Sequence, residues 1–430
     1  MIKKIVSVYS SNLILGLLGI LTVPILLGQI GEEGYGIYAL YLTIGSYFTI
    51  FELGVLKHFT RLISQGSKKI DGLISTFYFF TMTMIIIIII IIIIIINLFF
   101  QDEWRIGIFI ASIATVEYLF FLPTKINITY AKAHKNFERI SLFNFISGLI
   151  RYLILILSAI LTHNVYFVII LIVFRRVFDI RLSKVILKEN IAIFYLRNIS
   201  ISNVREVVYF YKESIFLSGA QALQININGM IVLIISKVFG LQELGIFRST
   251  FDFLSKIWFF SNGLGMVVFP YFASSGSGVN KNKKYISISW MFYSVIFMIS
   301  IALFPIINTY ILNDILSSEG DLLLYLFLLV GVLLLAQGNL SYEYLQAQGS
   351  YKSIMTTSFF TNIVFLVLTY LLYMFFPNLY IVVLSWMISI VIQTIIFERK
   401  ATNSKSLLLV FSVSVIFIWI ALGGLILINF

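Results

Sequence analysis

Charged side chains inside long apolar stretches are the residues of this sequence best suited to chemistry. Arg248, Asp252 and Lys256 are spaced four residues apart, so on a helix they share one face. Arg151 and Glu117 each lie in another apolar stretch. Cations of this kind can bind an anionic group, and the acids can carry a proton or a sodium ion. A structural interpretation is also open, in which the three-residue set is a self-neutralising ladder and Glu117 pairs with Arg151.

Other kinds of chemistry have little support in the sequence. The chain has no cysteine and only three histidines, which are far apart along it. It also lacks the glycine-rich phosphate-binding loop of ATP-driven motors. We therefore expect no enzyme activity, no metal site and no cofactor.

The charged residues stand out because the rest of the chain is apolar. Of its 430 residues, 60% are hydrophobic and 11% are charged, against roughly 25% charged residues in soluble domains. A soluble globule cannot keep so much apolar side chain away from water. The composition therefore excludes soluble enzymes and nucleic-acid-binding domains, and it predicts a polytopic membrane protein.

The apolar runs indicate helices rather than strands. They are continuous over roughly 20 residues, the length of a membrane-spanning helix, whereas the strands of a membrane barrel alternate apolar and polar residues. We predict an all-α protein with twelve spans and one additional span. These predicted spans cover residues 5–27, 35–57, 73–98, 105–124, 143–162, 165–182, 214–236, 246–270, 286–309, 322–341, 356–376, 379–397 and 406–428.

The basic residues predict the orientation of the chain. If the N-terminus is cytoplasmic, 25 of the 30 lysines and arginines lie on the cytoplasmic side, including eight between Arg175 and Lys212. Only Arg105 and Lys237 then lie on the other side. This distribution explains the net charge of +11 without a nucleic-acid partner. The basic loops are also expected to contact anionic lipid head groups.

Two sequence patterns recur in the second half of the chain. The pattern G-x4-G-I-[YF] occurs at 31–38 and again 209 residues later, at 240–247. A second pattern, at 130–140, recurs 214 residues later at 344–354. Because each repeat contains six spans, both halves run in the same direction, which is a parallel repeat. The predicted organisation is a six-helix bundle at 1–182, a basic cytoplasmic linker at 183–213, a six-helix bundle at 214–397 and an extra transmembrane helix at 398–430.

On these motifs the chain resembles the polysaccharide transport branch of the multidrug/oligosaccharidyl-lipid/polysaccharide (MOP) exporter superfamily, and in particular bacterial O-antigen flippases of the Wzx type. The resemblance rests on residues 24–28, 31–38, 51–54 and 130–140 and on their repeats. The chain departs from the family in its thirteenth span and in Asn228, where many relatives have an acid. The resemblance implies two MATE-like six-helix bundles. It also implies translocation of an undecaprenyl-diphosphate-linked oligosaccharide from the inner to the outer leaflet of a bacterial cytoplasmic membrane.

Under this resemblance the charged residues acquire expected roles. Arg151, Arg248 and Lys256 would meet the diphosphate or the sugar while the two halves rock in alternating access, and Glu117 and Asp252 are candidates for ion coupling. The implied partners are the lipid-linked oligosaccharide, membrane lipids, and polysaccharide polymerase and chain-length proteins. Two alternatives remain open: a multidrug or cation antiporter of the same superfamily, which would use the acids, and a membrane scaffold for polysaccharide enzymes.

Overall fold

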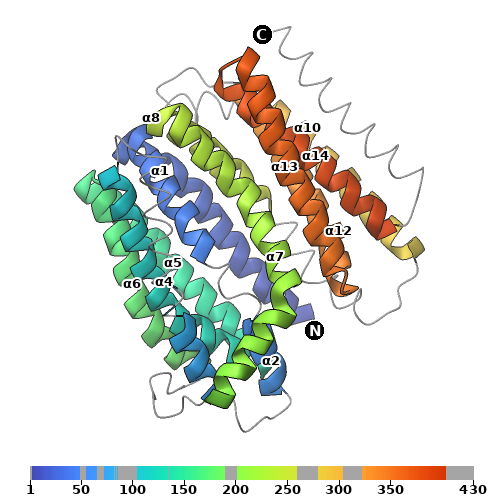
Figure 1. Ribbon diagram of the computed structural model, residues 1–430. Coiled ribbons are helices and arrows are strands. Elements are labelled where there is room, and N and C mark those ends of the chain that lie inside the picture. Colours follow the sequence, from blue (N-terminus) through green and yellow to red (C-terminus); the bar gives the residue numbers. More distant parts are fainter. Residues whose placement is uncertain are drawn as a thin grey trace. The chain divides into compact units, whose positions relative to one another are not determined.

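Helices make up every regular element in the part of the chain that the computed structural model describes (Figure 1). The described residues are 2–48, 55–64, 72–81, 83, 85, 104–134, 136–188, 201–258, 279–303 and 322–402. Seven helices among these residues are long and apolar enough to cross a membrane, so the chain is a multi-pass membrane protein. The predicted span 406–428, most of the span 73–98, and the motif residues 51–54 and 260–263 lie outside the described residues.

The chain divides into two compact units, Met1–Thr22 with Gln29–Ile225 and Val23–Gly28 with Asn226–Phe430. The helices of the first unit are α1 (Ile2–Phe48), α2 (Val55–Ser64), the short helix Gly72–Thr81, α4 (Trp104–Ala133), α5 (Phe137–Thr162), α6 (Val165–Leu187) and the start of α7 (Ile201–Val238). The second unit contains the rest of α7, α8 (Gly240–Leu254), the 3₁₀ turn η3 (Ser255–Ile257), α10 (Val279–Ala302), α12 (Leu322–Ala347), α13 (Tyr351–Phe375) and α14 (Leu379–Thr402).

In the first unit, α6 packs against both α4 and α5 (Figure 1). A short connection between α5 and α6 makes this possible. His163 ends α5 in the left-handed conformation, with φ of 49°. Asn164 then begins α6, because its side-chain oxygen accepts a hydrogen bond from the Tyr166 N–H at 2.9 Å. The chain therefore reverses within two residues, and α5 and α6 lie as antiparallel neighbours.

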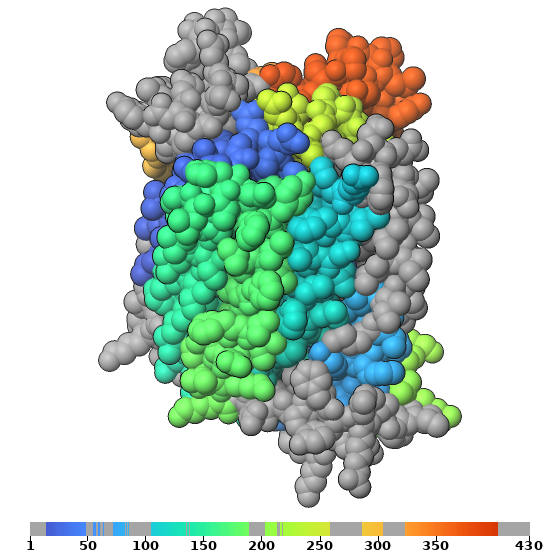
Figure 2. Space-filling model, turned by 90° about the vertical axis from the view of Figure 1, so that its left-hand side faces the viewer, coloured from blue at the N-terminus to red at the C-terminus, as the bar shows by residue number. Residues whose placement is uncertain are grey.

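The outer face of α5 and α6 is apolar (Figure 2). Leu153 and Leu157 on α5 are 56% and 55% exposed, and Phe174 on α6 is 68% exposed. Large apolar side chains exposed in a row are a liability in water but are the normal surface of a helix in lipid. This face therefore fits contact with the hydrocarbon of a bilayer.

The internal repeat is confirmed by the helices themselves. α13 begins 214 residues after α5, and α14 begins 214 residues after α6. The turn before α5 contains hydrogen bonds from the Asn136 N–H to the Ala131 carbonyl at 2.9 Å and from the His134 N–H to the Tyr130 carbonyl at 3.0 Å. The turn before α13 repeats both bonds, at the same distances and 214 residues later, from Ser350 to Leu345 and from Gln348 to Tyr344.

Both copies of the first motif begin with a glycine whose backbone only glycine adopts at little cost. Gly31 has φ of 72° and breaks α1 into two helical parts, and Gly240 has φ of 90° between α7 and α8. The sequence predicted a connection of several residues between 27 and 35. The structure needs only Gly31 for this break, because its positive φ redirects the backbone in one step.

Several predicted boundaries differ from the observed helices. Residues 201–213 of the predicted linker are the first part of α7, which continues to Val238. Aromatic contacts hold this part in place, since Phe210 packs edge-on against Phe59 and Tyr211 contacts Phe80. α14 continues past residue 397 to Thr402. The domain limits therefore remain predictions, with these helix ends as observed.

The predicted span 246–270 is also not one α-helix. α8 ends at Leu254, and the chain continues as η3. At this point the Ser255 hydroxyl donates to the Asp252 carbonyl at 2.9 Å. A serine hydroxyl that binds a carbonyl one turn back competes with the regular helical pattern, so the tighter 3₁₀ turn follows.

Candidate functional site

A group of charged side chains meets in the interior of the first unit. α6 contributes Arg175, Arg176 and Asp179 from near its middle, α4 contributes Glu117, and α5 contributes Arg151. Arg175 is 4% exposed and Asp179 is fully buried. Buried charges require partners, because leaving water costs each ion several kcal/mol. We call these five residues the charge cluster.

Asp179 is the most completely satisfied member of the charge cluster. Its Oδ2 lies 3.2 Å from Arg175 Nη2 and 3.3 Å from Arg176 Nη1. Its Oδ1 accepts a hydrogen bond from the Ser147 hydroxyl at 2.8 Å, and Arg175 Nη1 donates to the Ser147 carbonyl at 2.9 Å. These bonds join α5 to α6 through one carboxylate.

Glu117 is held by an arginine and a tyrosine. Arg176 Nε donates to Glu117 Oε1 at 2.8 Å, and the Tyr41 hydroxyl of α1 donates to Oε2 at 2.5 Å. Arg176 therefore bridges the two acids of the charge cluster. The suggested pairing of Glu117 with Arg151 is not what forms, because Arg176 on the neighbouring α6 takes that place.

Arg151 leaves the charge cluster with unused donors. Its Nη2 reaches the Tyr38 hydroxyl at 3.5 Å. The Nε atoms of Arg151 and Arg175 are buried and have no hydrogen-bond partner among the described residues. Three arginines against two acids leave a net charge of +1. A cluster with spare donors and an excess positive charge is suited to accept an oxygen atom of an anion.

The charge cluster is not sealed. The side chains of Arg176 and Glu117 are 16% and 15% exposed. The Arg176 guanidinium carbon also lies 4.0 Å from the centre of the Phe121 ring, a cation–π contact that keeps one face of the guanidinium against apolar surface. The accessible edge of the cluster is therefore the Arg176–Glu117 side.

The second predicted set of charges lies in the second unit. Arg248 Nε is 3.0 Å from Asp252 Oδ1, and the guanidinium stacks near Phe251. This pair is the self-neutralising arrangement that the four-residue spacing allows. Lys256 falls in η3, beyond the end of α8, so the regular spacing of the three residues is interrupted before it. The predicted site residues are thus divided, with Arg151 and Glu117 in the first unit and the other three in the second.

Sequence reasoning missed the α6 members of the charge cluster. It counted Arg175 and Arg176 among the cytoplasmic basic residues, although both lie inside the predicted span 165–182. The pattern R-R-x-x-D, with three- and four-residue spacings on a helix, was a signal that could have revealed them. Without these two arginines, 23 basic residues still favour a cytoplasmic N-terminus.

The repeat shows that these charges are not needed to join the helices. Ser147 and Asp179 correspond, 214 residues later, to Thr361 and Gln393. In the second unit Gln393 Nε2 donates to the Thr361 hydroxyl at 3.1 Å, so a neutral pair makes the same connection.

The other members of the cluster are also neutral in the second copy. Arg175 and Arg176 correspond to Ser389 and Ile390, Arg151 to Phe365, and Glu117 to Gly331. One copy of the fold therefore stands without the charge that the other copy carries. This contrast favours a functional role for the charge cluster.

Among the described residues, no group of three or more histidine, cysteine, aspartate or glutamate side chains is placed to hold a metal ion. The charge cluster itself is built for anions rather than cations, because each of its acids already contacts an arginine.

Comparisons with solved structures concern the whole fold. The chain is similar to an inward-facing multidrug resistance transporter of the MATE family of the MOP superfamily, with a TM-score of 0.66 and 13% identity over 92% of this chain and 97% of that chain. It is also similar to the lipid II flippase MurJ in an inward closed conformation, with a TM-score of 0.66 and 13% identity over 100% and 99% of the two chains. A third is the MATE multidrug transporter DinF-BH, with a TM-score of 0.58 and 13% identity over 94% and 96%.

Sequence comparison identifies the family. No curated protein sequence matches the chain. A family model described as "Polysaccharide biosynthesis protein" matches residues 1–276, which is well over half of the chain. The chain therefore belongs to the polysaccharide biosynthesis protein family, and its fold is that of MOP superfamily transporters.

Proposed function

We propose that the protein is a flippase for an undecaprenyl-diphosphate-linked oligosaccharide, an O-antigen or a similar polysaccharide repeat unit. The substrate would move from the inner to the outer leaflet of a bacterial cytoplasmic membrane by alternating access. The family, named for polysaccharide biosynthesis, supports a role in that pathway. The likeness to a lipid II flippase supports a fold able to move a lipid-linked substrate.

The observation that carries this proposal is the cationic excess of the charge cluster. A diphosphate needs several charge-assisted hydrogen bonds once it leaves water, and arginine supplies them in a planar fork. Arg151 and Arg175 each have a buried Nε without an acceptor among the described residues. The neutral second copy of the same helices shows that the fold does not require this excess.

In this mechanism the arginines bind the anion and the acids respond to it. Arg151 and Arg176 meet the diphosphate. An anion that binds Arg176 weakens its pair with Glu117, whose released carboxylate is the proposed ion-coupling group. In the second unit we retain Arg248 and Lys256 as proposed substrate contacts and Asp252 as a proposed coupling acid.

The decisive test is to delete the gene and to extract the lipid-linked intermediates. The proposal expects a complete diphosphate-linked repeat unit to accumulate on the inner leaflet and the surface polysaccharide to be lost. Complementation with Arg151→Gln together with Arg176→Gln is expected to fail. Lys184→Asn, which removes an exposed charge from α6 outside the cluster, is expected to restore transport.

A multidrug or cation antiporter is the second candidate, because MATE transporters share the fold. Such a protein needs an acid that is available to a cation. In the first unit both buried acids already contact arginines, which favours the flippase. Unchanged polysaccharide in the deletion strain, together with new sensitivity to cationic drugs, would reverse this choice.

The cellular setting follows from the same proposal. The protein would lie in the cytoplasmic membrane with its N-terminus on the cytoplasmic side, where the lipid-linked unit is made. Polysaccharide polymerase and chain-length proteins are the proposed partners, since they would use the translocated unit.

A further inference from the structure

One face of α4 carries a second cation next to the charge cluster. Glu117, Phe121 and Lys125 are spaced four residues apart, so they share this face, and all three are partly exposed. Lys125 Nζ lies 4.8 Å from the centre of the Phe121 ring. Arg176 contacts the same ring at 4.0 Å. Phe121 therefore stands between two cations from different helices.

The separation of the two cations suits a bridging anion. They are no farther apart than the sum of their distances to the ring, about 9 Å. One phosphate group that accepts a charge-assisted bond of about 2.8 Å on each side spans roughly 8 Å between two nitrogens. A neutral ring cannot balance two positive charges, so an anion at this position gains attraction from both.

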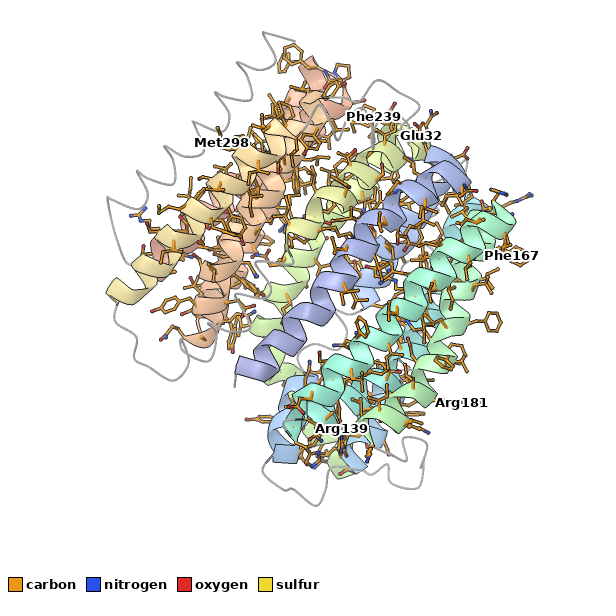
Figure 3. The ribbon with its side chains drawn as sticks, turned by 180° about the vertical axis from the view of Figure 1, so that it is seen from behind. Glu32, Arg139, Phe167, Arg181, Phe239 and Met298 are labelled. Carbon is orange, nitrogen blue, oxygen red and sulfur yellow. The ribbon has the colours of Figure 1, made fainter. Side chains whose placement is uncertain are left out.

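The place of Lys125 along α4 gives this pair a direction. The sequence predicted that Lys125 lies in a loop, but α4 continues to Ala133. Lys125 is thus about 12 Å from that end of the helix, and Glu117 is about 24 Å from it. Figure 3 shows Arg139 and Arg181 at this end of the first unit and Glu32 at the opposite end. With the N-terminus cytoplasmic, as proposed above, the cations lead from the cytoplasmic end toward Arg151.

The second copy of the fold lacks this arrangement. Phe121, Lys125 and Arg176 correspond to Leu335, Asn339 and Ile390. Both cations are replaced by neutral residues, although α12 and α14 pack together as α4 and α6 do. The packing of these helices therefore does not require the pair.

We infer that Lys125 and Arg176, on either side of Phe121, form an entry site for a phosphate-class anion on its way to Arg151 and Arg175. This inference rests on the proposed function and adds a first binding step to it. The ligand class is the phosphate or diphosphate head of a membrane lipid. Lys125 captures the head near the cytoplasmic end of α4, and Arg176 shares it with the deeper arginines.

The test measures binding rates on the full chain in phosphatidylcholine nanodiscs, with a fluorescent prenyl diphosphate as the probe. Lys125→Asn introduces the residue of the second copy. It is expected to slow association about 3- to 10-fold at low salt and to change dissociation less than about twofold, because a rim charge acts mainly on the encounter. The difference is expected to vanish at high salt, where exposed charges are screened. Arg176→Gln is expected to speed dissociation as well.

Two matched variants separate charge from packing. Lys184→Asn removes an exposed charge from the same end of the first unit and is expected to leave the association rate unchanged. Lys125→Arg keeps both the charge and the cation–π contact and is expected to restore the wild-type rate. If Lys125→Asn behaves like Lys184→Asn, or if Lys125→Arg remains slow, the entry site is wrong.

The outcomes also distinguish the inference from the proposed function. If Arg151→Gln loses binding while Lys125→Asn keeps the wild-type rate, only the entry site fails. If the wild-type chain does not bind the probe, the proposed function itself fails. Nanodiscs that contain phosphatidylglycerol test the other source of phosphate. The entry role is supported if the Lys125-dependent rate survives this lipid and overturned if the lipid abolishes it, since the site then holds a resident lipid.

Discussion

At the scale of single residues, the charge cluster combines stability with function. Asp179 compensates two arginines that would otherwise be buried without a counter-ion. The second copy achieves the same helix contact with Gln393 and Thr361. The ionic version therefore offers no stability that a neutral version cannot match, and its retention points to work on a charged ligand.

The first prediction concerns this ionic contact. Asp179→Gln leaves the buried Arg175 without its carboxylate and is expected to cost about 3–5 kcal/mol of stability. Adding Arg175→Ser, which reproduces the neutral pair of the second copy, is expected to recover most of that loss. Thermal unfolding of the two variants in detergent, followed by tryptophan fluorescence, measures both effects. Equal melting temperatures for the single and double variants would contradict the idea that the buried charge causes the loss.

At the scale of helices, close approaches decide where the sequence tolerates no side chain. A Cβ atom on Gly331 would lie 2.1 Å from Cζ3 of Trp386. The Trp386 ring is fully buried, and its Nε1 donates to Asn228 at 3.2 Å, so the ring has little freedom to move. Gly331 is thus the residue that lets α12 approach α14.

The second prediction follows from this contact. Gly331→Ala is expected to destabilise the protein by about 1–3 kcal/mol, because overpacking forces the ring or the backbone to shift. Gly16→Ala is the control, since nothing lies within 4 Å of a Cβ at that helical position. The control is expected to be neutral or stabilising by up to about 1 kcal/mol. The melting temperatures of the two variants provide the comparison, and a neutral Gly331→Ala would show that Trp386 can move.

The third prediction uses the two repeated backbone breaks. Alanine at Gly31 or Gly240 must adopt a positive φ, which costs roughly 1–2 kcal/mol for a residue with a Cβ. No atom crowds either position, so strain alone sets the cost. Because the breaks are equivalent in the repeat, we expect similar losses in melting temperature for the two variants. A loss at only one of them would mean that the two breaks are not used alike.

At the scale of the whole molecule, the orientation of the chain remains a prediction, and the absence of cysteine makes it easy to test. The fourth prediction places single cysteines at opposite ends of the first unit, Glu33→Cys and Arg181→Cys. With a cytoplasmic N-terminus, an impermeant maleimide added to intact cells should label Glu33→Cys but not Arg181→Cys. Permeabilised cells, in which both sites should react, are the control. The reverse pattern in intact cells would invert the proposed topology.

The sequence by itself determined the class, the membrane setting and the repeat of this protein. These features depend on local chemistry, because a continuous apolar run can satisfy its backbone in lipid only as a helix. Gly31 and Gly240 are local in the same sense, since their positive φ values follow from the residue type. The patterns at 31–38 and 130–140 therefore predicted the repeat that the helices and turn hydrogen bonds confirm.

Only the tertiary structure decided which charges meet. From the sequence, Glu117 had Arg151 as its nearest candidate partner, and Glu398 belonged to a segment beyond the second bundle. The structure instead pairs Glu117 with Arg176 and buries Glu398 in α14, where it accepts a hydrogen bond from the Trp290 indole at 2.8 Å. Such partnerships depend on the rotation and register of packed helices, which are set by many side chains at once. The spacing of charges along one helix therefore named the candidates, and the packing between helices chose among them.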